Sequence, residues 1–357
     1  MAMKFNHSSK MHRIVVLTDL HLRADYLPGY LNEQVKTLTR LVNKKPPDSV
    51  VINGDIFHRR NPKGAELLAF RRLLEGLHTK NIYVNRGNHD TVAKDGSTET
   101  TLSLFSDIAT IITETTTIRI HDLDFDFIPH YEDESIIIDH LKRSNNHVFG
   151  HFGFDGCVAN GSYLYESYVK KHHFKKTKYS PNLRVGDRLV FLGHIHKPKV
   201  YNDSIFVLGT QYSTTFGEAN AKKYIHELII RDSKVEVVRK PINFGIRHIV
   251  TTLDRLESDA KKYRFDSFYT ILRIKMDTLD EGTEKDLTET LLNKYNVKHI
   301  EFVFDDVLPK YEASHVDYDS LLTVDESIIH EYIDNANTIF SKPDLLKALE
   351  EIKLYET

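Results

Sequence analysis

The sequence has little cysteine, no long apolar run and no excess of basic residues. Its single cysteine, Cys157, rules out a disulfide within the chain and fits a reducing compartment. No stretch approaches the about 18 consecutive apolar residues that a membrane span needs. The polar first residues lack the apolar core of a signal peptide. We therefore expect a cytoplasmic protein with no membrane partner.

The balance between basic and acidic residues is relevant to the binding of nucleic acid. The chain carries 48 Lys and Arg against 51 Asp and Glu, so its formal net charge is −3. Proteins that bind nucleic acid often carry a positive net charge, so a large basic surface is not expected here, while local basic patches stay compatible with the composition. Apolar residues make up 40% and charged residues 28%, which is typical of a soluble globular chain. A length of 357 residues suffices for two domains.

Short apolar, β-branched runs indicate buried strands. The five clearest runs occupy residues 14–18, 49–53, 81–85, 146–150 and 188–193. Helix-period segments at 31–43 and 65–78 lie between them, and 111–128 alternates like a β-hairpin. Further strand-like pieces occur at 205–209 and 224–240. Strands that alternate with helices predict a layered α/β core.

The character of the sequence changes near residue 244. Two helix-like and two strand-like segments follow between 249 and 308, enough for a small second α/β domain. The segments 325–340 and 343–355 read as amphipathic helices. We expect a flexible tail, a large α/β domain, a small α/β domain and a helical tail, at residues 1–11, 12–243, 244–312 and 313–357.

Metal-type side chains follow each of the five strand-like runs. They are Asp19 and His21, then Asp55, then Asn88 with His89 and Asp90, then His151, and finally His194 and His196. In a mostly parallel sheet the ends of such strands meet at one edge, where sites normally form. Asp19 and His21 stand at positions i and i+2, so both would face the same side.

The candidate ligands form a mixed set of oxygen and nitrogen donors. Carboxylates, an amide carbonyl and imidazoles suit Mn²⁺, Fe²⁺ or Zn²⁺ better than Ca²⁺ or Mg²⁺ alone. The set exceeds what one ion takes from a protein. Two divalent ions about 3.5–4 Å apart, bridged by one carboxylate, would use it and would activate water against a phosphate ester.

Taken singly, these motifs have ordinary explanations. A DxH pair occurs often by chance, GD after a strand is usually a turn, and a lone histidine such as His151 is more often structural. The GNHD and GHIH motifs are more specific, because a plain turn seldom needs such a polar cluster after an apolar strand. All five elements in this order, each at a strand end, favour one shared site.

The order DxH, GDxF, GNHD, GH and GHxH resembles the signature of the calcineurin-like metallophosphoesterases. Within them the chain looks most like the SbcD-type DNA nuclease subunit, including its phage-encoded versions, because His58 follows GDIF. Protein serine/threonine phosphatases have GDxVDRG and GNHE instead, although the RG before NHD is shared with them. The resemblance covers residues 12–240 and, more loosely, the domain that follows.

The resemblance implies a fold and a domain plan. Residues 12–243 would form a four-layer α/β/β/α metallophosphoesterase sandwich, the nuclease domain. Residues 244–312 would form a smaller α/β capping domain that binds DNA. The helical tail 313–357 would grip the coiled-coil base of an SMC-like ATPase of the SbcC type, although packing of these helices on the chain's own core is equally compatible.

The resemblance also implies a ligand set for two metal ions, most often Mn²⁺. Asp55 would bridge the two ions. The first ion would take Asp19, His21 and His196, and the second would take Asn88, His151 and His194.

Three further residues would carry the catalytic roles of the family. His89 would not bind metal; it would stabilise the transition state or protonate the leaving 3′ oxygen. Asp90 would orient His89 through the other ring nitrogen, unless it is an ordinary turn or N-cap residue. His58 would lie near the scissile phosphate.

The substrate class that the resemblance implies is DNA. Basic residues at 58–63 and 170–178 would follow its backbone, unless they form a plain solvated face. Family members pair two subunits through helices equivalent to 62–77 and 98–110, which predicts a homodimer. An apolar stripe supports this pairing, although a core face explains it equally well: Leu67, Leu68, Phe70 and Leu74.

We therefore expect a Mn²⁺-dependent DNA phosphodiesterase of bacterial or phage type. It would act as a 3′→5′ exonuclease and single-strand endonuclease in DNA end processing, repair and recombination, gated by its ATPase partner. One alternative is a phosphatase or cyclic-nucleotide phosphodiesterase of the same fold, many of which lack the second domain. Another is a catalytically silent scaffold for the ATPase, against which the complete ligand set argues.

Overall fold

The computed structural model describes most of the chain up to residue 304. The described residues are 11–92, 99–154, 157, 186–242, 244–265, 269–276, 281–295 and 297–304. The flexible tail expected before Met11, the basic segment 170–178 and the helical tail 313–357 lie outside them. Their predicted roles therefore rest on the sequence.

The first of two large sheets contains the first three strands of the chain. Its strands are His12–Leu17 (β1), Ser49–Asn53 (β2), Ile82–Asn85 (β3), Thr110–Ile112 (β4), Tyr224–Arg231 (β11) and Lys234–Pro241 (β12). They lie in the order β12-β11-β1-β2-β3-β4. Neighbours from β1 to β4 are parallel, whereas β11 is antiparallel to both β1 and β12.

The second sheet is built in the same way from later strands. Its strands are Thr116–Ile120 (β5), Leu123–Ile128 (β6), His147–His151 (β7), Val190–Gly193 (β8), Lys199–Tyr201 (β9) and Ile205–Val207 (β10). They lie in the order β5-β6-β7-β8-β10-β9. The neighbours β6, β7, β8 and β10 are parallel, and β5 and β9 add antiparallel edges.

Two expectations about these strands are wrong. The five strands that precede the motifs do not share one sheet: β1, β2 and β3 belong to the first and β7 and β8 to the second. The predicted hairpin 111–128 begins only at Thr116, because residues 110–112 form β4 beside β3. Apolar runs that are buried on both faces look alike in sequence, so they do not reveal which sheet a strand joins.

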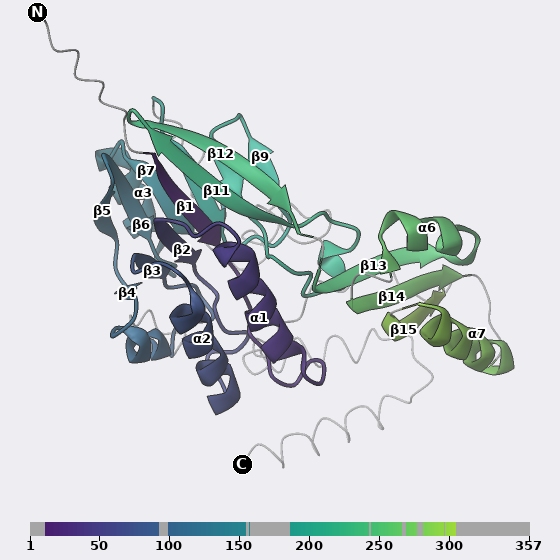
Figure 1. Cartoon of the computed structure of the whole chain (residues 1–357). Helices are drawn as coiled ribbons and strands as arrows, with labels where there is room; N and C mark the ends of the chain where they lie inside the picture. Colours follow the sequence, from purple (N-terminus) through teal and green to yellow (C-terminus); the bar gives the residue numbers. More distant parts are fainter. Residues whose placement is uncertain are drawn as a thin grey trace, which may run out of the picture. The chain divides into compact units, whose positions relative to one another are not determined.

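Helices cover the outer face of each sheet, which gives four layers (Figure 1). Tyr30–Asn43 (α1) and Gly64–Gly76 (α2) pack on the first sheet, and Glu134–Arg143 (α3) packs on the second. On α1 the buried residues recur at helical spacing: Leu31, Val35, Leu38 and Val42. The predicted α/β/β/α sandwich is confirmed.

Alternate side chains of each central strand enter two different cores. In β1, Val15 and Leu17 pack with the helices, whereas Ile14 and Val16 pack between the sheets. Aromatic rings dominate the core between the sheets. Phe149 lies within 5.3 Å, between ring centroids, of Phe125, Phe127 and Phe191.

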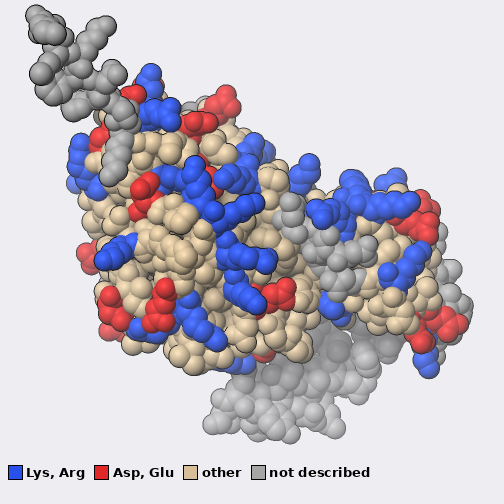
Figure 2. All heavy atoms as spheres, in the orientation of Figure 1, with Lys and Arg blue, Asp and Glu red and all other residues tan. Residues whose placement is uncertain are grey.

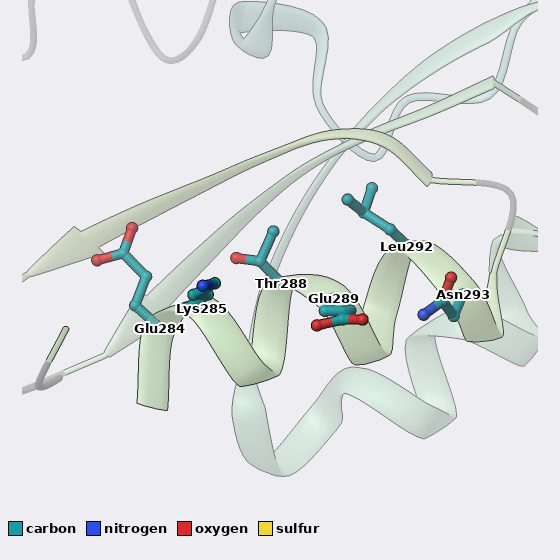
Figure 3. A pocket seen from close by; sticks show the side chains of 6 residues that line it. All are labelled: Glu284, Lys285, Thr288, Glu289, Leu292 and Asn293. Carbon is teal, nitrogen blue, oxygen red and sulfur yellow. The ribbon is translucent and has the colours of Figure 1, made fainter. Parts of the chain in front are cut away.

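A small three-stranded sheet follows with its own apolar core. Its elements are Ile246–Thr252 (β13), Leu256–Lys262 (α6), Tyr269–Met276 (β14), Glu281–Lys294 (α7) and Val297–Phe304 (β15), and β13 and β14 are parallel. Up to residue 304, the expected helix, strand, helix and strand correspond to α6, β14, α7 and β15, and β13 is a third strand that was not expected. A surface hollow on α7 is lined only by residues of that helix, among them Lys285 and Leu292 (Figure 3).

The described residues also form three 3₁₀ turns, and one of them matters for the predicted dimer surface. They are Thr101–Phe105 (η1), Phe216–Glu218 (η2) and Leu253–Arg255 (η3). In the predicted stripe on α2, Phe70 and Leu74 are buried and Leu67 packs against the core, so only Leu68 is free to face solvent. None of the described helices is long and apolar enough to cross a membrane.

The core between the sheets predicts a large stability loss for Phe149→Ala. Phe149 is fully buried, so the change removes ring contacts and leaves a cavity, which costs about 3–5 kcal/mol. The half-exposed Ile136 on α3 provides the control, and Ile136→Ala is expected to change stability by less than about 1 kcal/mol. Chemical denaturation measures both. Equal losses would show that this core does not hold the sheets together.

Candidate metal centre

Two asparagine amides hold the strand ends of the two sheets together. Asn53, the last residue of β2, donates its Nδ2 to the carbonyls of Gly150 at 2.9 Å and Phe191 at 3.1 Å, both in the second sheet. Asn85, the last residue of β3, donates to Asn53 Oδ1 at 3.0 Å and to the carbonyl of Ile128 at 3.2 Å. The edges that carry the predicted ligands are thereby fixed against each other.

The loops beyond these strands adopt an unusual backbone conformation. Asp19, His21, Asp55 and His194 all have positive φ, of 47°, 42°, 50° and 75°. Such residues cost on the order of 1–3 kcal/mol each and are retained where function requires them. Because β1 ends at Leu17, Asp19 and His21 face one site through these turns and not through strand alternation, which corrects the predicted reason.

Two glycines make room for the ligands. A Cβ on Gly54, whose φ is +88°, would lie 2.1 Å from the Nδ1 of His151, and one on Gly87 would lie 2.1 Å from Asp55 Oδ1. The glycines of GDIF and GNHD are therefore part of the site, because no other residue lets the backbone come so close.

One group of predicted ligands gathers Asp19, His21 and His196. The Nε2 atoms of His21 and His196 lie 3.0 Å apart, and Asp19 Oδ1 lies 3.8 Å from His196 Nε2. Two imidazole nitrogens at this separation need a proton or a cation between them. The arrangement can hold a metal ion.

A second group gathers Asp55, His151 and His194. His151 Nε2 lies 3.3 Å from Asp55 Oδ1, and His194 Nδ1 lies 2.9 Å from the side-chain oxygen of Asn88. All seven predicted ligands thus fall into two adjacent groups. The carboxylate of Asp55 connects them, because its other oxygen lies 3.8 Å from His21 Nε2.

The hydrogen bonds of His151 leave one nitrogen for a metal. Its Nδ1 lies 2.8 Å from the carbonyl of Asn53, which places the ring hydrogen there. Its Nε2 is buried and, within the described part of the chain, forms no hydrogen bond of good geometry. A buried imidazole nitrogen that faces a carboxylate takes a proton or a divalent ion.

Protonation states follow from burial and neighbouring charge. Burial opposes the charge of Asp55, but His151 and His89 outweigh it and bring the pKa of this carboxyl well below its ordinary value. Burial lowers the pKa of His21 and His194 well below the usual range, so both imidazoles are neutral. The pKa of His151 rises to about 9, because Asp55 outweighs burial. A cation between Asp55 and His151 would replace that proton.

His58 and His89 lie side by side next to the first group. Their rings stack with centroids 6.3 Å apart, and the ring of His89 meets that of His21 at 5.1 Å. The backbone N–H of His89 donates to Asp55 Oδ1 at 2.9 Å. Burial, with the charge of Arg23, lowers the pKa of His58 to about 4, so this ring is neutral.

Asp90 does not orient His89 as the resemblance implies. The Nδ1 of His89 lies 2.8 Å from the carbonyl of His58. The carboxylate of Asp90 instead accepts backbone N–H groups, from Ile56 at 2.9 Å and from Gly87 at 2.9 Å. Asp90 thus clamps the loop after β2 to the loop after β3, and burial raises its pKa to about 6.

A cluster of cations borders the site. Asp25 accepts from Arg23 at 2.7 Å and from Lys63 at 2.9 Å, and Arg59 lies 3.2 Å away. These hydrogen bonds, from Arg23 first, hold the pKa of Asp25 well below its usual range. A small hollow beside the first group is lined by Asp19, His21, Arg23, Tyr26 and His58, among others.

The motifs did not reveal several buried polar residues behind the ligands. Asn53 and Asn85 join the sheets, and Glu218 with Lys223 lies behind His196. Burial opposes the charge of Glu218, but Lys223 and His196 hold its pKa well below the usual range. The asparagines end predicted strands, which was a usable signal. Glu218 ends the short 3₁₀ helix η2, and no motif surrounds it in the sequence.

Solved structures with some likeness differ in their activities. A purple acid phosphatase from yellow lupin (Lupinus luteus) seeds has a TM-score of 0.41 and 13% identity, covering 65% of this chain and 52% of that one. A nuclease from Pseudomonas putida has a TM-score of 0.30 and 13% identity, covering 63% and 87%. An anchor protein of the inner membrane complex of Plasmodium has a TM-score of 0.36 and 14% identity, covering 65% and 89%. The chain thus spans about half of the lupin phosphatase. These values transfer no activity to it.

Sequence comparison identifies the family of this chain. No curated protein matches the sequence. The model of the calcineurin-like phosphoesterase family matches residues 12–228, which is more than half of the 357 residues and includes every predicted ligand. The chain belongs to the calcineurin-like phosphoesterase family.

Proposed function

We propose that this phosphoesterase is a two-metal, Mn²⁺-dependent DNA nuclease of the SbcD type. The observation that supports it best is the pair of ligand groups joined by Asp55, with His58 and His89 beside them and cations at the border. In this proposal the chain is a 3′→5′ exonuclease and single-strand endonuclease that processes DNA ends.

The residues present fit two divalent ions. Asp19, His21 and His196 would hold one and Asn88, His151 and His194 the other, with Asp55 shared. When bound, the ions would activate a water molecule and hold the phosphate oxygens for in-line attack.

The histidines beside the ligands would act on the phosphodiester directly. His89 carries its ring hydrogen toward the carbonyl of His58, which fixes the imidazole in one orientation. To act as a general acid the ring would carry a second hydrogen on its other nitrogen, and it would give that hydrogen to the phosphate or to the leaving 3′ oxygen. His58, kept neutral by burial, would add a second hydrogen-bonding group. Asp90 acts by clamping the loop that carries His89.

The distribution of charge supports a polyanionic substrate. Near the site, Arg23, Arg59 and Lys63 share the single carboxylate of Asp25, which leaves a local positive surplus. Figure 2 shows Lys and Arg side chains gathered over the middle of the face that carries α1 and β12. A net charge of −3 therefore coexists with basic patches that can follow a phosphate backbone.

We propose two protein partners as well. One is a second copy of this chain, paired through α2 and η1. The other is an SMC-like ATPase of the SbcC type, gripped by residues 313–357, for which the sequence predicts helices. The capping role of 244–312 on DNA belongs to the same proposal.

Asp55→Asn should abolish the paired metal site. The amide removes the negative charge that both ion positions share, so we expect bound Mn²⁺ to fall from two ions per chain to at most one. Inductively coupled plasma mass spectrometry after reconstitution and desalting measures this. Asp107→Asn, an exposed carboxylate paired with Arg71, is the control and should keep two ions. Unchanged content in Asp55→Asn would contradict the bridging role.

His89→Asn should remove DNA cleavage and leave metal content intact. We expect hydrolysis of 3′- and 5′-labelled linear duplex with Mn²⁺ to drop by about 10²–10⁴-fold, the usual contribution of a general acid. The exposed His78→Asn is the matched control.

A bis-phenyl phosphodiester and a phosphomonoester are assayed as substrates in parallel with the DNA. Hydrolysis of the monoester with intact DNA would favour a phosphatase. Complete inactivity of the wild type, also with the ATPase present, would favour a scaffold.

Leu68→Glu with Leu104→Glu should keep the chain monomeric. The two leucines are 62% and 60% exposed, and Arg71 on α2 joins their elements because it donates to the backbone carbonyl of Leu104 in η1 at 3.4 Å. Charges there would oppose an apolar interface. Light scattering at micromolar concentration should give a dimer for the wild type and for the control Ile136→Glu. A monomeric wild type would contradict the dimer.

A further inference from the structure

We propose that Glu218 is a positioning residue for one metal position, through His196. The inference rests on the proposed function, because it assumes that Asp19, His21 and His196 bind an ion. In it, the Glu218 carboxylate holds the imidazole of His196 so that Nε2 faces the other two ligands.

The contacts of the His196 ring assign its hydrogen. Its Nδ1 lies 3.1 Å from Glu218 Oε1 and 3.1 Å from Thr214 Oγ1. A carboxylate only accepts, so Nδ1 carries a hydrogen and Nε2 is the nitrogen left to bind a metal ion. That nitrogen lies 3.0 Å from His21 Nε2.

Glu218 divides its two oxygens between two tasks. Oε1 accepts hydrogen bonds from the His196 ring, from the backbone N–H of Thr214 at 3.0 Å and from the Thr214 hydroxyl. Oε2 pairs with Lys223 and accepts from Thr210 Oγ1 at 2.7 Å. Lys223 also donates to the backbone carbonyl of His196 at 2.9 Å. The ring and the backbone of one ligand are therefore held by the same ion pair.

The pair is deeply buried, and the segment that carries Glu218 is hydrogen-bonded to β13. Glu218 is 1% exposed and Lys223 is 4% exposed. The segment around η2 is tied to β13 at two points, because Ser213 N donates to Ile246 O at 3.2 Å and Asn220 N donates to His248 O at 3.1 Å. A carboxylate fixed in this way keeps the imidazole from turning.

The other ligand group is built differently. His151 is oriented by the neutral carbonyl of Asn53, and His194 Nδ1 faces the amide of Asn88. Among the described ligands only His196 has an ionised carboxylate behind the ring. A change at Glu218 should therefore weaken one ion of the two.

Glu218→Gln tests this directly. Second carboxylates behind metal-binding histidines typically account for about 10–100-fold in metal affinity. Mn²⁺ titration followed by electron paramagnetic resonance should show two ions in the wild type, with one weakened by that factor in Glu218→Gln and the other unchanged. Glu227→Gln is the matched control: Glu227 is also buried and paired with Arg13 and Lys240, away from the ligands.

Two further measurements separate positioning from folding. The double variant Glu218→Gln with Lys223→Met removes the whole ion pair, so it leaves no buried lysine without a carboxylate, and it should show the same single weakened ion. In ¹⁵N spectra of histidine-labelled, metal-free protein, His196 should carry its hydrogen on Nδ1 in the wild type. It should show a mixture of the two ring hydrogens in Glu218→Gln.

The outcomes distinguish this inference from the proposed function. A wild type that binds no Mn²⁺ would overturn the two-metal function itself. A wild type with two ions whose affinities and His196 ring hydrogen are the same in Glu218→Gln would overturn the role of Glu218 and leave the function standing. Equal weakening of both ions would also contradict it.

Discussion

The side-chain amide of Asn53 is the interaction on which the site depends. Asn53 ends β2 in the first sheet, and its side-chain Nδ2 donates to two carbonyls of the second sheet. The backbone carbonyl of the same residue meets the Nδ1 of His151 at 2.8 Å and the hydroxyl of Thr18 at 2.9 Å. Buried polar groups are costly without partners, and here every group named has one. One residue therefore fixes the distance between two sheets and the orientation of a ligand.

Because the two sheets are fixed in this way, the strained turns stay in the folded structure. Asp19, His21, Asp55 and His194 hold left-handed conformations that an isolated chain would leave. The buried aromatic core between the sheets and the amide links keep the strand ends in register, so the turns have no room to relax. The positions of Gly54 and Gly87 follow from the same closeness, because any side chain there would collide with a ligand.

The sequence predicted the strands and the metal-type residues at their ends, because apolar runs and the polar motifs that follow them are local signals. The resemblance implied two sheets, but the sequence did not show which strand joins which sheet, since a strand buried on both faces carries no mark of its partner. The resemblance also gave Asp90 the wrong contact: a carboxylate next to His89 in sequence turns to the backbone N–H groups of Ile56 and Gly87. The contact between Glu218 and His196 could not be predicted from the sequence, because the strand β10 separates the two residues along the chain.

The balance of buried charge argues for the ions more strongly than any single distance. Asp19 and Asp55 are each 1% exposed, and within the described residues neither forms an ion pair with a lysine or arginine. The nearby Lys223 is engaged by Glu218. Buried carboxylates are unstable unless cations or strong hydrogen bonds compensate them. Their neighbours are mainly imidazoles, of which burial keeps His21 and His194 neutral. Positive charge must come from protons on the remaining histidines or from divalent ions, and only the ions would satisfy all the imidazole lone pairs at once.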